Sequence, residues 1–293
     1  MLEINKIYNE AFETAMLKID NNSIDCMCID PPYKYLDSDL ESDYSEIFLI
    51  KQAKRVLKKD SLLLTFGRGD SFHELCYLLK KEGFMFKEEI IWIKQKHSSP
   101  VTPINRLHES ICIFGLGKGK VRDVKVPYLE IKRYRIDRII ADVKRIKSEL
   151  NNTMSLDAMI EFLENEKAEY NQDAKQSGHG VTVNNSLLKR KNRGISTLEN
   201  IVNGNKEQSV IYEPIDHYKF EHPTQKPTRL IERLINLISD ESDIVLDCFA
   251  GSGTTGIAAI NTKRNFLCFE KEKKYFNIAS KRITKHKSQL TIF

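Results

Sequence analysis

Short apolar runs alternate with amphipathic stretches along most of the chain. Buried strands are predicted where an apolar run is bounded by polar or turn-forming residues, at 23–30, 62–66, 89–93, 110–114, 244–246 and 265–269. Helices are predicted where apolar residues recur at helical spacing, over 44–57, 72–79, 230–238, 254–260 and 275–283. Alternation of this kind predicts an α/β fold in which helices cover a parallel sheet.

The alternation stops after residue 117 and resumes near Pro227. Between these points apolar stripes predict two helices, over 136–150 and 156–163, and two such helices can pair as a hairpin. We interpret residues 1–117 and 217–293 as one domain, interrupted by a mainly helical insertion at 118–216.

The formal net charge of +5 conceals an uneven distribution. Residues 1–50 hold 3 basic and 11 acidic side chains, whereas the rest of the chain holds 43 basic and 30 acidic ones. Basic residues are concentrated at 118–147, 189–193 and 261–293. This asymmetry favours a polyanionic partner such as nucleic acid, and scattered solvated lysines are the alternative.

Several protein classes are disfavoured by the sequence. No apolar run approaches the roughly 20 residues that a membrane helix needs. The first residues show no basic-then-apolar signal segment, and the 6 cysteines form no C-x-x-C pair. We therefore expect no membrane association, no metal site, no disulfide framework and a reducing cytoplasmic location.

A glycine-rich segment, DCFAGSGTTG at 247–256, follows a predicted strand and opens a predicted helix. Gly251, Gly253 and Gly256 match G-x-G-x-x-G, a spacing that permits a tight turn and close approach of a ligand. Glu270 ends the next predicted strand, where an acid can hold ribose hydroxyls. The segment predicts a nucleoside-containing cofactor. A nicotinamide dinucleotide and a purely structural turn remain open at this point.

A second motif, Asp30-Pro31-Pro32-Tyr33, also ends a predicted strand. The two prolines stiffen the backbone and donate no hydrogen bonds. A carboxylate beside an outward carbonyl can accept both hydrogens of one amino group, and a neighbouring ring can stack on a flat heterocycle. This equipment suits an exocyclic amine of a base. The alternative is a strand-terminating turn with a buried tyrosine.

A third motif, HPTQKP at 222–227, precedes the helix that leads to the glycine-rich segment. Lys226 can pair with a carboxylate, and Thr224 or Gln225 can hydrogen-bond to one. Taken alone, the motif is also compatible with a polar loop at a helix start.

The three motifs, in this order, resemble the signature of DNA amino-methyltransferases that use S-adenosylmethionine. The resemblance is to the group whose catalytic motif precedes the cofactor motif, and it covers residues 4–117 and 217–284. The IWIK run at 91–94 and His108-Glu109 belong to it. It implies a Rossmann-like methyltransferase sheet with circularly permuted motif order and double-stranded DNA as partner. The insertion would then hold the target-recognition region.

The resemblance also implies residue roles. Asp30 and the Pro31 carbonyl would hold the amine of a flipped base, which would stack on Tyr33. Asp247 would lie near the methionine part of the cofactor and Glu270 on its ribose, while the 222–227 segment would close over its amino-acid end. The remaining predicted cofactor contacts are Phe249, Ala250, Gly251, Ser252, Gly253, Thr254, His222, Thr224, Gln225, Lys226 and Glu10.

Asp rather than Ser at position 30 favours adenine N6 as the target, with cytosine N4 as the alternative. The phosphate-contact candidates are Lys281, Arg282, Lys285 and Lys287, whereas the acidic stretch at 37–43 is expected to cover the site without touching phosphates. A homodimer and a cognate restriction nuclease are further partners that the resemblance allows. An RNA or protein amino-methyltransferase, a nicotinamide dehydrogenase and a non-catalytic DNA-binding subunit remain as rival interpretations.

Overall fold

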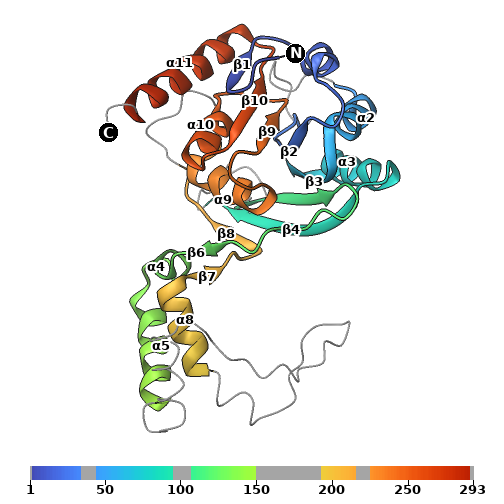
Figure 1. Cartoon of the computed structure of the whole chain (residues 1–293). Helices are drawn as coiled ribbons and strands as arrows, with labels where there is room; N and C mark the ends of the chain where they lie inside the picture. Colours follow the sequence, from blue (N-terminus) through green and yellow to red (C-terminus); the bar gives the residue numbers. More distant parts are fainter. Residues whose placement is uncertain (1, 34–43, 95–106, 150–192, 216–224, 291–293) are drawn as a thin grey trace, which may run out of the picture. The chain divides into compact units, whose positions relative to one another are not determined.

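The computed structural model describes residues 2–33, 44–94, 107–149, 193–215 and 225–290 (Figure 1). The chain divides into two compact units. The larger comprises Met1–Arg122 and Gln208–Phe293, and the smaller comprises Asp123–Glu207. The two ends of the chain thus fold together, and the smaller unit lies within the 118–216 range of the predicted insertion.

The larger unit is an α/β structure, which confirms the predicted fold class. Its strands are β1 (Lys6–Tyr8), β2 (Ile24–Ile29), β3 (Leu57–Gly67), β4 (Met85–Ile93), β5 (His108–Gly115), β8 (Val210–Tyr212), β9 (Ile244–Asp247) and β10 (Asn265–Phe269). Its helices are α1 (Phe12–Ala15), η1 (Met16–Lys18), α2 (Glu46–Val56), α3 (Gly69–Lys81), α9 (Thr228–Ile238), α10 (Thr254–Asn261) and α11 (Lys273–Leu290).

The strands form one sheet in the order β1-β10-β9-β2-β3-β5-β4-β8. Strands β1, β10, β9, β2 and β3 run parallel, but β5 runs antiparallel to both β3 and β4. The prediction of a wholly parallel sheet was therefore wrong at β5. A parallel connection normally needs a crossover helix, and the sequence between β4 and β5 carries no helical apolar stripe.

Two hydrophobic layers cover the sheet because side chains alternate between its faces. Along β3, Leu63 belongs to the core formed with α1, α2 and α3, whereas its neighbours Leu62 and Leu64 are buried on the opposite face. On that opposite face α9 contacts β3, and α10 lies between α9 and α11 and contacts β10 (Figure 1). Residues buried on both faces explain why the strands read as continuous apolar runs.

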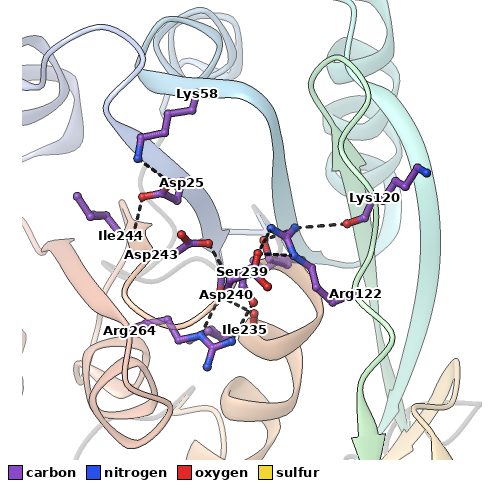
Figure 2. Close-up of polar contacts among 11 residues, drawn as sticks. Asp25, Lys58, Lys120, Arg122, Ile235, Ser239, Asp240, Asp243, Ile244 and Arg264 are labelled. Atoms are coloured by element: carbon purple, nitrogen blue, oxygen red, sulfur yellow. Dashed lines mark hydrogen bonds and ion pairs between the residues drawn. The ribbon is translucent and has the colours of Figure 1, made fainter.

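A polar cluster closes the edge of the sheet at which β2 and β9 begin (Figure 2). Asp25 accepts hydrogen bonds from Lys58 Nζ at 2.6 Å and from the backbone amide of Ile244 at 3.0 Å. Arg122 pairs with Asp240 at 2.9 Å, and its backbone amide bonds to the carbonyl of Leu237. The contacts of Arg122 hold the chain in place directly before the smaller unit begins at Asp123. They lie at the edge of the sheet opposite the one that carries the predicted motifs.

The smaller unit contains a two-stranded ladder of β6 (Lys125–Val126) and β7 (Asn205–Lys206), and helices α4 (Tyr128–Ile131), α5 (Ile136–Glu149) and α8 (Arg193–Asn203). The predicted helix at 136–150 is present as α5, and it packs against α8, which the sequence did not predict. The predicted helix at 156–163 and the basic residues 189–192 lie outside the described residues.

Helix α5 buries a carboxylate, whereas part of its apolar stripe is exposed. Asp142 is 4% exposed and pairs with Lys132 at 2.7 Å and with Arg145 at 3.0 Å. By contrast, Ile136 is 72% exposed, and Val143 is also exposed. The apolar spacing therefore identified the helix, but it did not identify Asp142 as a buried residue.

Among the described residues, no helix is both long and apolar enough to cross a membrane. In the same part of the chain, no three metal-ligating His, Cys, Asp or Glu side chains gather into a cluster. All 6 cysteines are free thiols, and 5 of them are buried.

Candidate active site

Three acidic residues lie at the carboxyl ends of neighbouring parallel strands. Asp30 directly follows β2, Asp247 is the last residue of β9, and Glu270 directly follows β10. The strands are adjacent in the sheet, so the three acids share one edge. The strand-end crevice of an open α/β sheet is the usual place for a ligand.

The D-P-P-Y and H-P-T-Q-K-P motifs meet at Asp30. Its Oδ1 atom accepts a hydrogen bond from the Tyr33 hydroxyl at 2.7 Å, and its Oδ2 atom lies 2.5 Å from Lys226 Nζ. Ser71 donates to the backbone carbonyl of Tyr33 at 2.8 Å and holds the turn. The prediction that Lys226 pairs with a carboxylate is confirmed.

Lys226 is a buried cation between two carboxylates, with a residue exposure of 8%. Glu109 Oε2 lies 3.3 Å from its Nζ atom, and the ring centroids of Phe66 and Tyr33 lie at 5.0 Å and 5.7 Å. Burial alone would lower the pKa of Lys226, but the carboxylates of Asp30 and Glu109 outweigh it and raise the pKa above the ordinary value. The side chain therefore remains an ammonium.

Glu109 lies on β5, directly opposite Trp92 of β4 in the antiparallel ladder. Its Oε1 atom contacts the ammonium of Lys94. Burial would raise the pKa of Glu109, but Lys226 and Lys94 hold it below its usual range. The sequence singled out the segments that carry Lys94 and Glu109, yet it assigned neither residue to the site.

The glycine-rich turn joins β9 to α10 through left-handed backbone at Gly251, where φ is +50°, and at Gly253, where φ is +76°. A Cβ atom at Gly253 would lie 2.9 Å from Cβ of Ala279 on α11. At Gly256 it would lie 3.0 Å from Ile283 Cδ1. Gly253 and Gly256 thus permit close packing of α10 against α11, while Gly251 shapes the turn itself.

Asp247 and Glu270 are buried carboxylates held mainly by backbone amides. Asp247 accepts a hydrogen bond from the amide of Phe249 at 2.9 Å, and Glu270 accepts from those of Gly251 and Glu272 at 2.8 Å each. Burial raises the pKa of Asp247 to about 7 and also raises that of Glu270. Within the described part of the chain, neither carboxylate forms an ion pair with a lysine or arginine.

The other predicted cofactor residues of the turn are tied to neighbouring helices. The Phe249 ring lies 5.1 Å from that of Phe12 on α1, and Ala250 is buried. Ser252 and Thr254 are buried, with their hydroxyls 3.3 Å apart, and Arg282 of α11 donates to the Ser252 carbonyl at 2.5 Å.

The remaining predicted cofactor contacts lie outside the glycine-rich turn. Glu10, two residues beyond β1, pairs with Lys18 at 2.5 Å, and that pairing lowers the pKa of Glu10. The side-chain oxygen Oε1 of Gln225 is buried and accepts no hydrogen bond from the described residues. His222 and Thr224 lie outside the described residues.

A sheet edge that combines a buried carboxylate–ammonium pair with a glycine-rich turn defines an enzyme site of the Rossmann-like class. The family model described as DNA methylase, N6_N4_Mtase, matches residues 24–281. The chain is 30% identical over 292 residues to Type II methyltransferase M1.MboII of Moraxella bovis, with 96% of each chain covered. The chain therefore belongs to this DNA methylase family and is a DNA methyltransferase.

Further comparisons agree on relationship and fold. The chain is 26% identical to DNA adenine methyltransferase YhdJ of Escherichia coli K12, with 91% of this chain and 78% of YhdJ covered. The crystal structure of the M1.HpyAVI–SAM complex superposes with a TM-score of 0.54 at 21% identity, covering 94% of this chain and 98% of that one. The structure of PvuII DNA methyltransferase, which is cytosine-N4-specific, superposes with a TM-score of 0.57 at 14% identity. The match covers 97% of this chain and 92% of that one. The expected Rossmann-like methyltransferase fold is confirmed.

Proposed function

We propose that this chain transfers the methyl group of S-adenosylmethionine to N6 of adenine in double-stranded DNA. The observation that carries the proposal is the position of Asp30, held between Tyr33 and Lys226 on the same sheet edge as Asp247 and Glu270. Adenine is favoured over cytosine because position 30 is Asp rather than Ser. The relationship to an enzyme named as a DNA adenine methyltransferase supports the same choice.

The buried acceptors at this edge fit the donor groups of S-adenosylmethionine. That cofactor carries an ammonium, ribose hydroxyls and a positively charged sulfonium, which match carboxylates that lack a lysine or arginine partner in the described part of the chain. Glu270 would hold the ribose, and Asp247 would lie near the methionine part. The buried Oε1 atom of Gln225 accepts no hydrogen bond from the described residues, so it is a further acceptor for a donor group of the cofactor. When bound, S-adenosylmethionine supplies a methyl group that is activated by the sulfonium.

Asp30 and the Pro31 carbonyl then hold the two hydrogens of the target amine and direct the nitrogen lone pair toward the methyl group. A base must be flipped out of the duplex to reach this edge, at a cost of a few kcal/mol. Stacking on Tyr33 offsets part of this cost. The carboxylate of Asp30 stabilises the positive charge that develops on the amine nitrogen. Orientation of the two substrates supplies much of the remaining rate gain.

The DNA contacts are assigned to two regions. The smaller unit, Asp123–Glu207, is proposed as the target-recognition region because it replaces the αβ alternation with a basic helical segment. On α11, the exposed Lys281 and Lys285 are the proposed phosphate contacts. Arg282 and Lys287 serve this role less well because they bond to the carbonyls of Ser252 and Asn5. The predicted covering loop at 37–43 lies outside the described residues.

A cytoplasmic location and a cognate restriction nuclease belong to the proposal, and the relatives named Type II methyltransferases support its restriction–modification part. Formation of a homodimer belongs to the same proposal. Oligomeric state is measurable by light scattering, with and without duplex DNA.

The proposal is tested by offering labelled S-adenosylmethionine and equal amounts of duplex DNA, single-stranded DNA, RNA and protein. We expect label in duplex DNA, at one sequence context that sequencing can map. Preferential labelling of RNA or protein would contradict the proposed substrate. Absence of cofactor binding, with binding of a nicotinamide dinucleotide instead, would contradict the proposed cofactor.

A further inference from the structure

Both oxygens of Asp30 already have partners in this structure. Oδ1 accepts the Tyr33 hydroxyl at 2.7 Å, and Oδ2 lies 2.5 Å from Lys226 Nζ. Each oxygen can accept a second hydrogen bond, but an amine that takes the position of the ammonium on Oδ2 displaces Lys226. A displaced buried ammonium needs another anionic acceptor, because an unpaired buried charge costs several kcal/mol.

Glu109 offers that acceptor. Its Oε1 atom is engaged by Lys94, and its Oε2 atom lies 3.3 Å from Lys226 Nζ. Oε2 is buried and accepts no hydrogen bond of good geometry from the described residues. A movement of about 0.5 Å would bring the ammonium to the roughly 2.8 Å that is typical of a charge-assisted hydrogen bond.

The surroundings allow this movement without a change in net charge. Lys226 lies 5.0 Å from the Phe66 ring centroid and 6.0 Å from that of Trp92, so aromatic faces stabilise the ammonium beside either carboxylate. The two lysines, Lys94 and Lys226, balance the two carboxylates. The directions of the pKa shifts keep Lys226 protonated and Glu109 ionised.

We propose that Glu109 is a positioning residue that takes the Lys226 ammonium when the target amine binds to Asp30, and thereby frees Oδ2. The inference rests on the proposed role of Asp30 in holding the amine. Glu109 touches neither the base nor the methyl donor in this arrangement. It acts through Lys226.

The first test is single-turnover methyl transfer to duplex DNA by Glu109→Gln. A neutral amide cannot balance the ammonium, so Lys226 stays on Asp30, and we expect the rate to fall about tenfold or more. Affinities for S-adenosylmethionine and DNA should stay within about twofold of the wild type. Glu109→Asp keeps the charge and should retain an intermediate rate.

A charge-balanced variant separates positioning from simple stabilisation. Glu109→Gln leaves the buried Lys226 and the half-buried Lys94 with one carboxylate, and the double variant Lys94→Met/Glu109→Gln restores neutrality. We expect the melting temperature to recover in the double variant while the transfer rate stays low. In a Lys226→Met background, Glu109→Gln should cause no further loss of rate, because no ammonium has to move.

Wild-type transfer rates in Glu109→Gln, or recovery of the rate in the double variant, would overturn the inference. If Glu109→Gln fails to fold, Glu109→Asp and the double variant decide, since both keep the local charges balanced. Failure of the proposed function looks different, because the wild-type protein would then transfer no methyl group to DNA. If the wild type is active and Asp30→Ala is not, equal rates for Glu109→Gln and wild type refute only the role of Glu109.

Discussion

Lys226 Nζ and Asp30 Oδ2 lie 2.5 Å apart, although 196 positions separate the two residues in the sequence. The contact joins the turn after β2 to the segment that enters α9, and it places a cation beside the carboxylate proposed to hold the target amine. Because Lys226 is buried and also faces Glu109, the three side chains form one charged unit whose members depend on each other.

Asp30→Ala should abolish methyl transfer and leave cofactor binding intact. The carboxylate contacts the amine, whereas most proposed cofactor contacts lie in the glycine-rich turn and at the ends of β9 and β10. Transfer is measured with labelled S-adenosylmethionine and affinity by calorimetry. The matched control is Asp20→Ala, since Asp20 is exposed and precedes β2, whereas the motif follows that strand. Turnover of Asp30→Ala at the wild-type rate would remove Asp30 from the proposed mechanism.

Gly251→Val should weaken cofactor binding about tenfold or more, because left-handed backbone costs a side-chain-bearing residue roughly 1–2 kcal/mol. The strain would displace the amide that Gly251 donates to Glu270. Gly83→Ala is a suitable control because Gly83 also has positive φ, at +95°, in the turn between α3 and β4. It should lower the melting temperature without altering affinity. Unchanged affinity in Gly251→Val, measured by calorimetry, would contradict the assignment.

Asp247 should make the cofactor-free protein less stable as the pH rises. Its pKa is about 7 in the folded protein and near 3.8 in the unfolded chain, so the native state binds more protons between these values. The free energy of unfolding therefore falls from about pH 4 to pH 7 and is level above. A difference of that size corresponds to at most about 4 kcal/mol.

Urea unfolding of wild type and Asp247→Asn at pH 5 and pH 8 measures this contribution. Asp247→Asn should be the more stable protein at pH 8, with a smaller advantage at pH 5. Asp20→Asn serves as the exposed control and should follow the wild type. Parallel pH dependence of Asp247→Asn and wild type would show that Asp247 does not carry the shifted pKa.

Lys281→Gln/Lys285→Gln should weaken DNA binding and make it less sensitive to salt. Each phosphate contact contributes about 0.9 to the slope of log affinity against log salt, so the slope should decrease by about 2. Lys51→Gln/Lys59→Gln removes the same charge from exposed positions at α2 and β3 and should leave the slope nearly unchanged. Equal slopes for the two double variants would show that Lys281 and Lys285 do not contact the DNA phosphates.

The sequence predicted the local parts of the site well. D-P-P-Y and the glycine-rich segment mark the ends of β2 and β9 because both use residues with restricted or special backbone geometry, and such signals are local. Strands and helices of the larger unit were recognised from periodicity. Short strands such as β1 and β8 were missed because three residues carry too little pattern.

Contacts that depend on the register between paired strands could not be predicted from the sequence. Glu109 reaches Lys226 because β5 pairs antiparallel with β4 and places Glu109 opposite Trp92. Nothing in the local pattern specifies that register. Lys226 was expected to meet a carboxylate, but only the fold shows that it meets two. Likewise, the burial of Asp142 on α5 depends on Lys132 and Arg145, which an apolar stripe does not reveal.

Chemical identification of the modified base tests the central claim most directly. Unmethylated duplex DNA is incubated with the protein and S-adenosylmethionine, digested to nucleosides and examined by mass spectrometry, with Asp30→Ala in parallel. We predict N6-methyldeoxyadenosine from the wild-type protein and none from Asp30→Ala. N4-methyldeoxycytidine as the product, or N6-methyldeoxyadenosine formed equally by both proteins, would contradict the account.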